Sequence, residues 1–147
     1  MALIDYNVPR TDWIPGAAWD SEDDREEFTS KVGLACVLQR DRLGHWCGYV
    51  ALPEGHPWAA KDLSEIDSKV VYGGIKSRGT VDGAEGFFVG FACNEPGDLQ
   101  PGMMKWRRDA ADSGTYRTFD FAMAECEKLA EVVAAAVRGT SAVKKKK

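Results

Sequence analysis

The residues best suited to chemistry lie close together in residues 44–58, whose sequence is GHWCGYVALPEGHPW. This segment holds both histidines of the chain, His45 and His56, and the thiol of Cys47. The histidines would need acidic partners from elsewhere in the fold to complete a metal site. The candidates for that role are Glu54, Asp62 and Asp98. Because no H-x-H or H-E-x-x-H spacing is present, the sequence favours neither a metal site nor another cofactor.

A cysteine nucleophile would need a base beside it and a thiol of lowered pKa. In an extended strand His45 and Cys47 project to the same face, since alternate residues do so. Along a strand they stand about 6 to 7 Å apart, which is too far for direct proton transfer. The chain has no C-x-x-C pair, so we expect four buried, reduced thiols that pack like small hydrophobic side chains. They are Cys36, Cys47, Cys93 and Cys126.

A glycine-rich segment, YGGIKSRG, follows at residues 72–79. Gly73 and Gly74 would expose backbone N–H groups, and strand alternation places Lys76 and Arg78 on one face. Together these groups could receive a phosphate or a carboxylate. The segment matches neither a Walker A loop nor a dinucleotide-binding fingerprint, and an exposed edge of a sheet would show the same pattern.

Several aromatic residues lie next to turn glycines, prolines or basic residues, where rings can stack on a planar ligand or on arginine. They are Trp46, Tyr49, Trp58, Tyr72 and Trp106. Packing in the core is the alternative role for such rings. Rings, two basic side chains and a glycine floor would suit a compact anionic heterocycle. The candidate ligand-binding residues are therefore His45, Trp46, Tyr49, His56, Tyr72, Gly73, Gly74, Lys76, Arg78, Asp98 and Trp106.

Strands and turns must hold these residues in place. Residues 32–40 and 45–52 are apolar runs joined by a short polar loop, which predicts a β-hairpin. Residues 69–79 and 87–94 predict a third and a fourth strand, the fourth apolar on both faces. Ahead of them we expect an irregular segment that Trp13 and Trp19 pin to the body, and then an acidic helix from Asp20 to about Lys31. Residues 59–68 and 103–114 predict a helical turn and a short helix.

The clearest element is a helix from about Thr118 to Arg138. Its apolar residues recur at helical spacing and form one stripe, made of Phe121, Leu129, Val132, Val133, Ala136 and Val137. Thr118 suits the N-terminal cap of this helix, and Gly139 suits its end. We therefore predict one α+β domain over residues 1–143, an antiparallel sheet of about four or five strands with the long C-terminal helix packed on one face.

Composition and charge narrow the choice of partners. The chain of 147 residues has 19 basic and 23 acidic side chains, and four of the basic ones are the lysines of residues 144–147. Without this tail, which we expect to be disordered, the charge is about −8, so duplex nucleic acid is an unsuitable partner. No apolar run can span a bilayer, and the N-terminus lacks the features of a signal peptide. We expect a cytoplasmic protein with no membrane partner, and self-association stays open.

The order of four segments along the chain carries a resemblance. The segments are GHWCGYVALPEGHPW, VYGGIKS, GFFVGFACNEPGDLQPG and AECEKLAEVV. This order resembles a family of small, uncharacterised proteins encoded by bacteriophages and prophages. The family pattern has a W-C-G-Y-V strand, a G-H-P turn, an H-G-G segment and a G-F-D-C segment followed by G-D. The resemblance spans about residues 34–133. The matching positions are Trp46, Gly48, Tyr49, Gly55, His56, Pro57, Gly73, Gly74, Gly97 and Asp98.

The chain also departs from the family pattern. Tyr72 and Asn94 or Glu95 stand where the family has histidines, and Ala92 stands where it has aspartate. If those residues form a metal or acid-base cluster in relatives, this chain has lost most of it. The resemblance implies a small accessory protein that acts in the cytoplasm of an infected host, and it implies no particular activity.

The leading functional hypothesis is a protein that binds and sequesters a small anionic, nucleotide-like ligand, and thereby counteracts host defence signalling. One alternative is a small hydrolase that uses His45 or His56 with Asp98. Another is an inhibitor of a host protein that binds through the acidic helix at residues 20–27. In a purely architectural interpretation, His56 and Asp98 tie two loops together by a hydrogen bond. The sequence favours binding over catalysis without excluding turnover.

Overall fold

The structure is a computed structural model that describes residues 18–41, 44–60, 71–95, 98–99, 101 and 115–146, with side chains of the last helix described to residue 136. The described residues form a five-stranded antiparallel sheet, two short 3₁₀ helices and a long C-terminal helix. The strands are β1 (Arg25–Thr29), β2 (Ala35–Arg40), β3 (Trp46–Ala51), β4 (Ser77–Gly79) and β5 (Phe88–Ala92). The helices are the two short ones, Ala18–Ser21 and Pro57–Ala60, and α2 (Phe119–Lys146). This confirms the predicted α+β fold.

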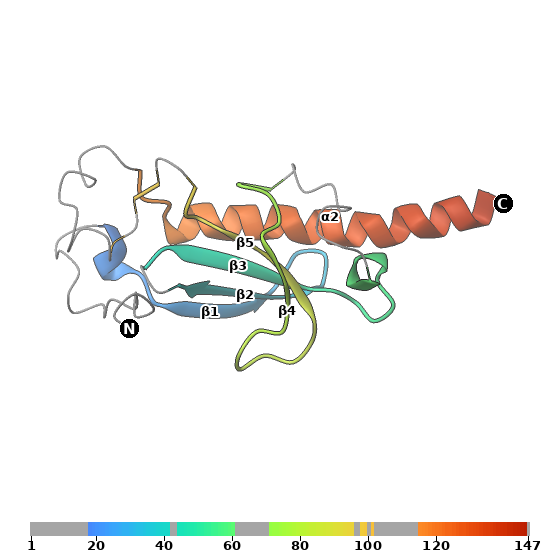
Figure 1. The fold of residues 1–147 in the computed structure, drawn as a ribbon, viewed down its shortest axis with the longest axis horizontal. Helices are drawn as coiled ribbons and strands as arrows, with labels where there is room; N and C mark the ends of the chain where they lie inside the picture. Colours follow the sequence, from blue (N-terminus) through green and yellow to red (C-terminus); the bar gives the residue numbers. More distant parts are fainter. Residues whose placement is uncertain are drawn as a thin grey trace, which may run out of the picture.

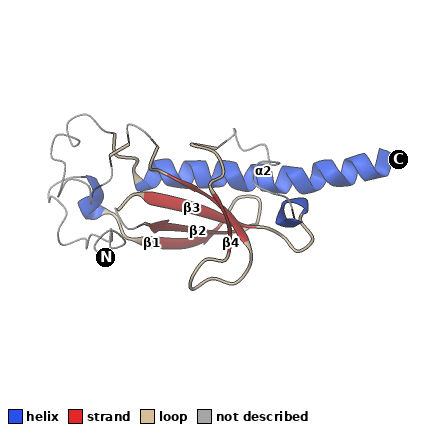
Figure 2. Ribbon diagram, viewed as in Figure 1, coloured by secondary structure: helices blue, strands red, loops and turns tan. Residues whose placement is uncertain are grey.

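The strands are arranged in the order β1-β2-β3-β5-β4. The predicted hairpin is confirmed, because β2 and β3 pair antiparallel from Cys36 opposite Val50 to Arg40 opposite Trp46. α2 runs along one face of the sheet and projects beyond it at its C-terminal end (Figure 1). The same two layers, helix and sheet, are distinguished by colour in Figure 2.

Strand alternation divides the side chains between the face that α2 covers and the opposite face. On the covered face Trp46, Val50 and Phe91 are completely or almost completely buried in the main core. Helix α2 adds the buried residues Ala122, Cys126, Leu129, Ala130 and Val133 to this core. On the opposite face Val37 and Phe88 belong to a separate, smaller cluster. All four cysteines are free and buried, as predicted.

Helix α2 begins as predicted and ends later than predicted. The Thr118 hydroxyl oxygen accepts a hydrogen bond from the Phe121 N–H at 3.1 Å and so caps the helix. The helix continues through Gly139 to Lys146, so the expected end at Gly139 is wrong. A single glycine costs a helix only about 1 kcal/mol, which neighbouring helical residues can offset. The disorder expected for residues 144–147 stays a prediction. Within the described residues, no helix combines the length and the apolar character of a membrane span.

The predicted acidic helix at residues 20–31 is wrong. Strand β1 occupies residues 25–29 of that segment and pairs with β2, with Phe28 opposite Cys36. The segment has one apolar residue, Phe28, which packs at the edge of the main core. A short helix with one apolar side chain gains little from packing, whereas a strand pairs its backbone with β2 and still buries Phe28 in part. The exposed acidic side chains tolerate either conformation.

The predicted third strand is shorter than expected. Residues 71–74 form a turn in which the Gly74 N–H donates to the Val71 carbonyl oxygen at 2.9 Å. Gly73 and Gly74 both have positive φ, which interrupts an extended strand, and β4 starts only at Ser77. Some predictions lie outside the described residues: those on Trp13, Trp106 and the segments 61–68 and 103–114.

Candidate functional site

Three of the predicted site residues, Tyr72, Gly73 and Asp98, lie near Arg117, which comes shortly before α2. Asp98 has a side chain only 1% exposed. It accepts hydrogen bonds from the Tyr72 hydroxyl at 2.6 Å, from Arg117 Nε at 3.0 Å and from the Glu95 N–H at 3.0 Å. The carboxylate is therefore fully engaged, and it fixes the positions of Tyr72 and Arg117.

The electrostatics of this group follow from its contacts. Burial, together with the hydrogen bond to Asp98, raises the pKa of Tyr72 to about 12. The hydrogen bond to Asp98 likewise raises the pKa of Arg117 above its ordinary value. At neutral pH Tyr72 is thus a neutral hydrogen-bond donor and Arg117 a fixed cation. Neither residue is suited to act as a general base.

Beside this group the surface has a hollow of about 440 Å³. Its lining residues are Val71, Tyr72, Gly73, Arg117, Phe121, Glu125 and Lys128. We call it the Tyr72 hollow. The Arg117 guanidinium carbon lies 4.9 Å from the ring centroids of both Tyr72 and Phe121, and the two rings meet edge to face at 5.1 Å. The hollow therefore combines aromatic surface with a cation held against it.

The far side of the Tyr72 hollow is formed by an ion pair on α2. Lys128 Nζ lies 3.1 Å from a carboxylate oxygen of Glu125, and the Lys128 side chain is 53% exposed. The other Glu125 oxygen accepts a hydrogen bond from the Tyr72 N–H at 2.9 Å. Glu125 therefore anchors the 71–74 turn to the helix, and Lys128 retains donor capacity toward solvent.

The two basic residues of the glycine-rich segment do not line the same hollow. Lys76 forms an ion pair with Glu95 at 3.0 Å. Arg78 donates to the Trp58 carbonyl oxygen at 3.2 Å and lines a separate hollow of about 160 Å³ with Tyr49. Gly74 belongs to the turn itself. The described contacts therefore do not bring Lys76 and Arg78 together in a single phosphate-binding site.

His56 is part of the packing between the loop and α2. Its Nδ1 accepts a hydrogen bond from the Trp58 N–H at 3.0 Å, so its Nε2 is the nitrogen that donates to the Val133 carbonyl oxygen at 2.9 Å. The ring also packs edge to face against Trp58. His56 thus ties a loop to the helix as a structural residue, although its partner is Val133 and not the Asp98 expected from the sequence.

Two more of the predicted residues, His45 and Trp46, are buried at the start of β3, at 5% and 0% exposure. Trp46 faces α2, whereas His45 and Cys47 face away from it. Burial, together with the nearby Asp41 carboxylate, raises the pKa of the Cys47 thiol to about 12. A thiolate nucleophile at Cys47 is therefore disfavoured in the protein as described.

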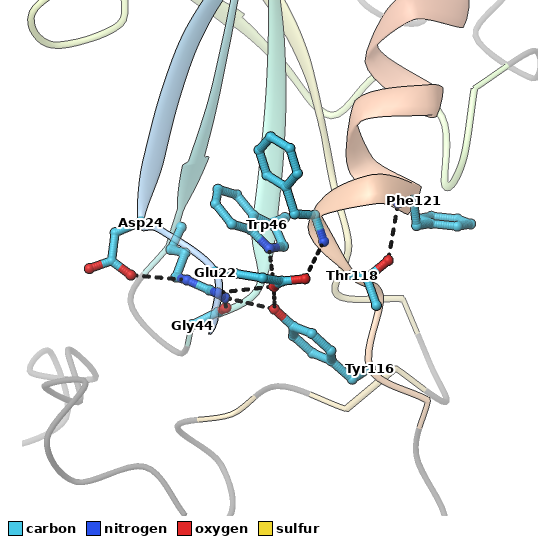
Figure 3. Close-up of polar contacts among 9 residues, drawn as sticks. Glu22, Asp24, Gly44, Trp46, Tyr116, Thr118 and Phe121 are labelled. Carbon is cyan, nitrogen blue, oxygen red and sulfur yellow. Dashed lines mark hydrogen bonds and ion pairs between the residues drawn. The ribbon is translucent and has the colours of Figure 1, made fainter. Parts of the chain in front are cut away.

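A polar cluster that no sequence pattern indicated surrounds Glu22 (Figure 3). One Glu22 oxygen accepts hydrogen bonds from the Tyr116 hydroxyl at 2.5 Å, from Trp46 Nε1 at 3.1 Å and from Arg40 at 3.2 Å. The other accepts from the Phe119 N–H at 2.9 Å, at the start of α2. Opposing effects act on this group: burial would raise the pKa of Glu22, but these hydrogen bonds and the charge of Arg40 lower it below its ordinary value. We call this the Glu22 cluster, and its contacts join β2, β3 and α2.

Comparisons of the chain with models of protein families, with curated proteins and with solved structures found no match. The geometry therefore carries the functional argument. It defines a surface hollow lined by rings and cations, which come from the 71–74 turn, from α2 and from Arg117 just before α2.

Proposed function

We propose that this protein binds and sequesters a small anionic, nucleotide-like ligand in the Tyr72 hollow. The observation that carries the proposal is the convergence of two rings, Tyr72 and Phe121, with two cations, Arg117 and Lys128, around one volume. The bacteriophage setting and the interference with host defence signalling belong to the same proposal, and they rest on the resemblance of the sequence.

The hollow has more hydrogen-bond donors than acceptors. A guanidinium carries five N–H donors and an ammonium three. In the described contacts, Arg117 uses its Nε to donate to Asp98. Lys128 uses its ammonium group to donate to Glu125. The acceptors are largely committed, because Asp98 is buried and Glu125 holds the Tyr72 N–H. An anion therefore suits the remaining capacity better than a cation.

Size and shape favour a compact planar ligand. A volume of about 440 Å³ lies within the range of small-molecule sites, which is roughly 300 to 1,000 Å³. The Arg117 guanidinium and the rings of Tyr72 and Phe121 offer faces and edges on which a heterocycle can stack. A nucleobase could stack on these groups while a phosphate of the same ligand lies near Lys128.

Thermal-shift and calorimetric titrations with cyclic, ADP-ribose-type and linear nucleotides test the proposal. At least one of them should stabilise the wild-type protein, and Lys128→Ala should weaken its binding about tenfold, as loss of a charge-assisted hydrogen bond does. The matched control is Lys76→Ala, which removes a similarly exposed lysine from the pair with Glu95 outside the hollow. The proposal fails if no nucleotide binds, or if the two variants weaken binding equally.

Recovery of the bound ligand after denaturation separates sequestration from turnover. A sequestering protein returns the ligand unchanged, whereas a hydrolase returns a product. The hydrolase alternative gains no support from the contacts of His56, because both of its ring nitrogens bond to the backbone. The inhibitor alternative loses its proposed helix, because residues 20–27 contain only the end of a short 3₁₀ helix (Ala18–Ser21) and the start of β1. We therefore propose binding alone.

A further inference from the structure

The end of the β2–β3 hairpin brings three potential metal ligands together on the sheet face opposite α2. Asp41 directly follows β2 and His45 directly precedes β3. The Asp41 N–H donates to the His45 carbonyl oxygen at 2.9 Å, and the Gly44 N–H donates to the Asp41 carbonyl oxygen at 2.9 Å. These two backbone bonds hold Asp41 and His45 opposite each other.

The register of the sheet adds Cys47 to the pair. Cys47 is opposite Gln39 in the ladder, two residues from His45, so alternation places all three side chains on one face. One donor atom from each of Asp41, His45 and Cys47 lies within 4.8 Å of the other two. The separation of about 6 to 7 Å expected along an ideal strand is therefore reduced, since His45 stands just before the strand begins.

We propose that Asp41, His45 and Cys47 form a binding site for Zn²⁺ or a similar transition-metal ion, with an open fourth position for water. Zn²⁺ binds nitrogen, sulfur and oxygen ligands at about 2.0 to 2.3 Å in a tetrahedron, which places the donors roughly 3.3 to 3.8 Å apart. His45 Nε2 and Asp41 Oδ2 are 3.6 Å apart already. Since all three donor atoms lie within 4.8 Å of one another, the remaining donor–donor distances need to shorten by about 1.5 Å at most.

The ligand types select the class of metal. Imidazole and thiolate are soft or borderline donors that Mg²⁺ and Ca²⁺ do not prefer, whereas Zn²⁺ accepts this mixed set. The Asp41 side chain is 53% exposed, so it can adjust its position and offers an entry path from solvent. The Tyr49 side chain lies near Cys47 and favours the ionised form of its thiol. On binding, the Cys47 S–H bond breaks, the sulfur bonds the metal and the proton leaves to solvent.

Titration of the full chain with Co²⁺ tests this site, because a cobalt–thiolate bond gives a charge-transfer absorption band in the near ultraviolet. We expect about one equivalent of Co²⁺ to produce the band and Zn²⁺ to abolish it by competition. Cys47→Ala should remove the band. Cys126→Ala, which deletes a buried thiol on the α2 side of the sheet, should keep it.

If Cys47→Ala fails to fold, Asp41→Asn still tests the site, because the Asp41 side chain is exposed and its substitution should leave the fold intact. It should weaken Co²⁺ binding at least about tenfold, whereas Glu26→Gln, at an exposed acid on β1, should leave binding unchanged. The site is refuted if Co²⁺ gives no thiolate band in the folded wild type. It is equally refuted if the band survives in folded Cys47→Ala, or if Asp41→Asn and Glu26→Gln bind alike. These outcomes do not depend on nucleotide binding at the Tyr72 hollow.

Discussion

Replacing Glu22 by glutamine changes one atom of the Glu22 cluster and should destabilise the fold strongly. The carboxylate accepts four hydrogen bonds, from Tyr116, Trp46, Arg40 and the Phe119 N–H. A glutamine keeps one oxygen, and its amide nitrogen then faces a donor. If that donor is the Phe119 N–H, the start of α2 loses its partner.

The magnitude follows from these contacts. A buried donor left without an acceptor costs about 1 to 3 kcal/mol, and hydrogen bonds to a neutral group are weaker by about 1 kcal/mol than those to a charged one. The Arg40 side chain is 5% exposed, and it would lose its charged contact with Glu22 while its ion pair with Asp24 remains. We expect Glu22→Gln to lower the free energy of unfolding by about 2 to 4 kcal/mol. Urea unfolding at pH 7, followed by tryptophan fluorescence, measures this difference.

The difference should depend on pH. Because the pKa of Glu22 is lower in the folded protein than its ordinary value of 4.5, its ionised form adds stability above that pH. This stability is lost as the pH falls through the folded-state pKa, so wild type and Glu22→Gln should converge in acid. Glu26→Gln is the control and should change stability by less than about 0.5 kcal/mol at any of these pH values. If Glu22→Gln changes the free energy of unfolding at pH 7 as little as Glu26→Gln does, or by an amount that does not depend on pH, the stabilising role of the Glu22 cluster is refuted.

Two other substitutions test the packing. Gly48→Ala should lower the free energy of unfolding by about 1 to 3 kcal/mol in urea titrations, because its methyl group would overlap the buried ring of Phe91; an unchanged stability would show that the ring has room to move. His56→Ala should cost about 2 to 4 kcal/mol, since the Val133 carbonyl and the Trp58 N–H lose their partner, and hydrogen exchange at Trp58 should speed up. Equal exchange rates in wild type and variant would contradict that anchoring role.

Sequence patterns predicted those parts of the fold that depend on local periodicity. The hairpin and α2 follow from apolar runs and a capped helical stripe, and both are confirmed. The segment of β1 was misassigned because Phe28 is its lone apolar residue, and the decision between helix and strand depends on β2, which is adjacent only in the fold. The position of Phe121 on a helical stripe was visible, but not that its ring, besides packing against the main core, also contacts Tyr72.

Predicting the candidate sites from sequence was harder still, because their residues come together only in the folded structure. Tyr72, Gly73 and Asp98 were identified from sequence, whereas Arg117 and Lys128 carry no local signal that connects them to a turn 43 or more residues earlier. Asp41 was missed for a different reason. The hairpin was predicted, but its pairing of Asp41 with His45 requires the exact register of the turn, which the polar loop alone does not specify.

The late position of α2 in the chain matters during protein synthesis. Trp46, Val50 and Phe91 leave the ribosome well before the helix that covers them. Until residues 122–133 emerge, the nascent sheet exposes the apolar face that α2 later covers, and this favours association between chains. Chaperones that shield nascent chains should therefore raise the soluble yield, and chains truncated before Phe119 should aggregate.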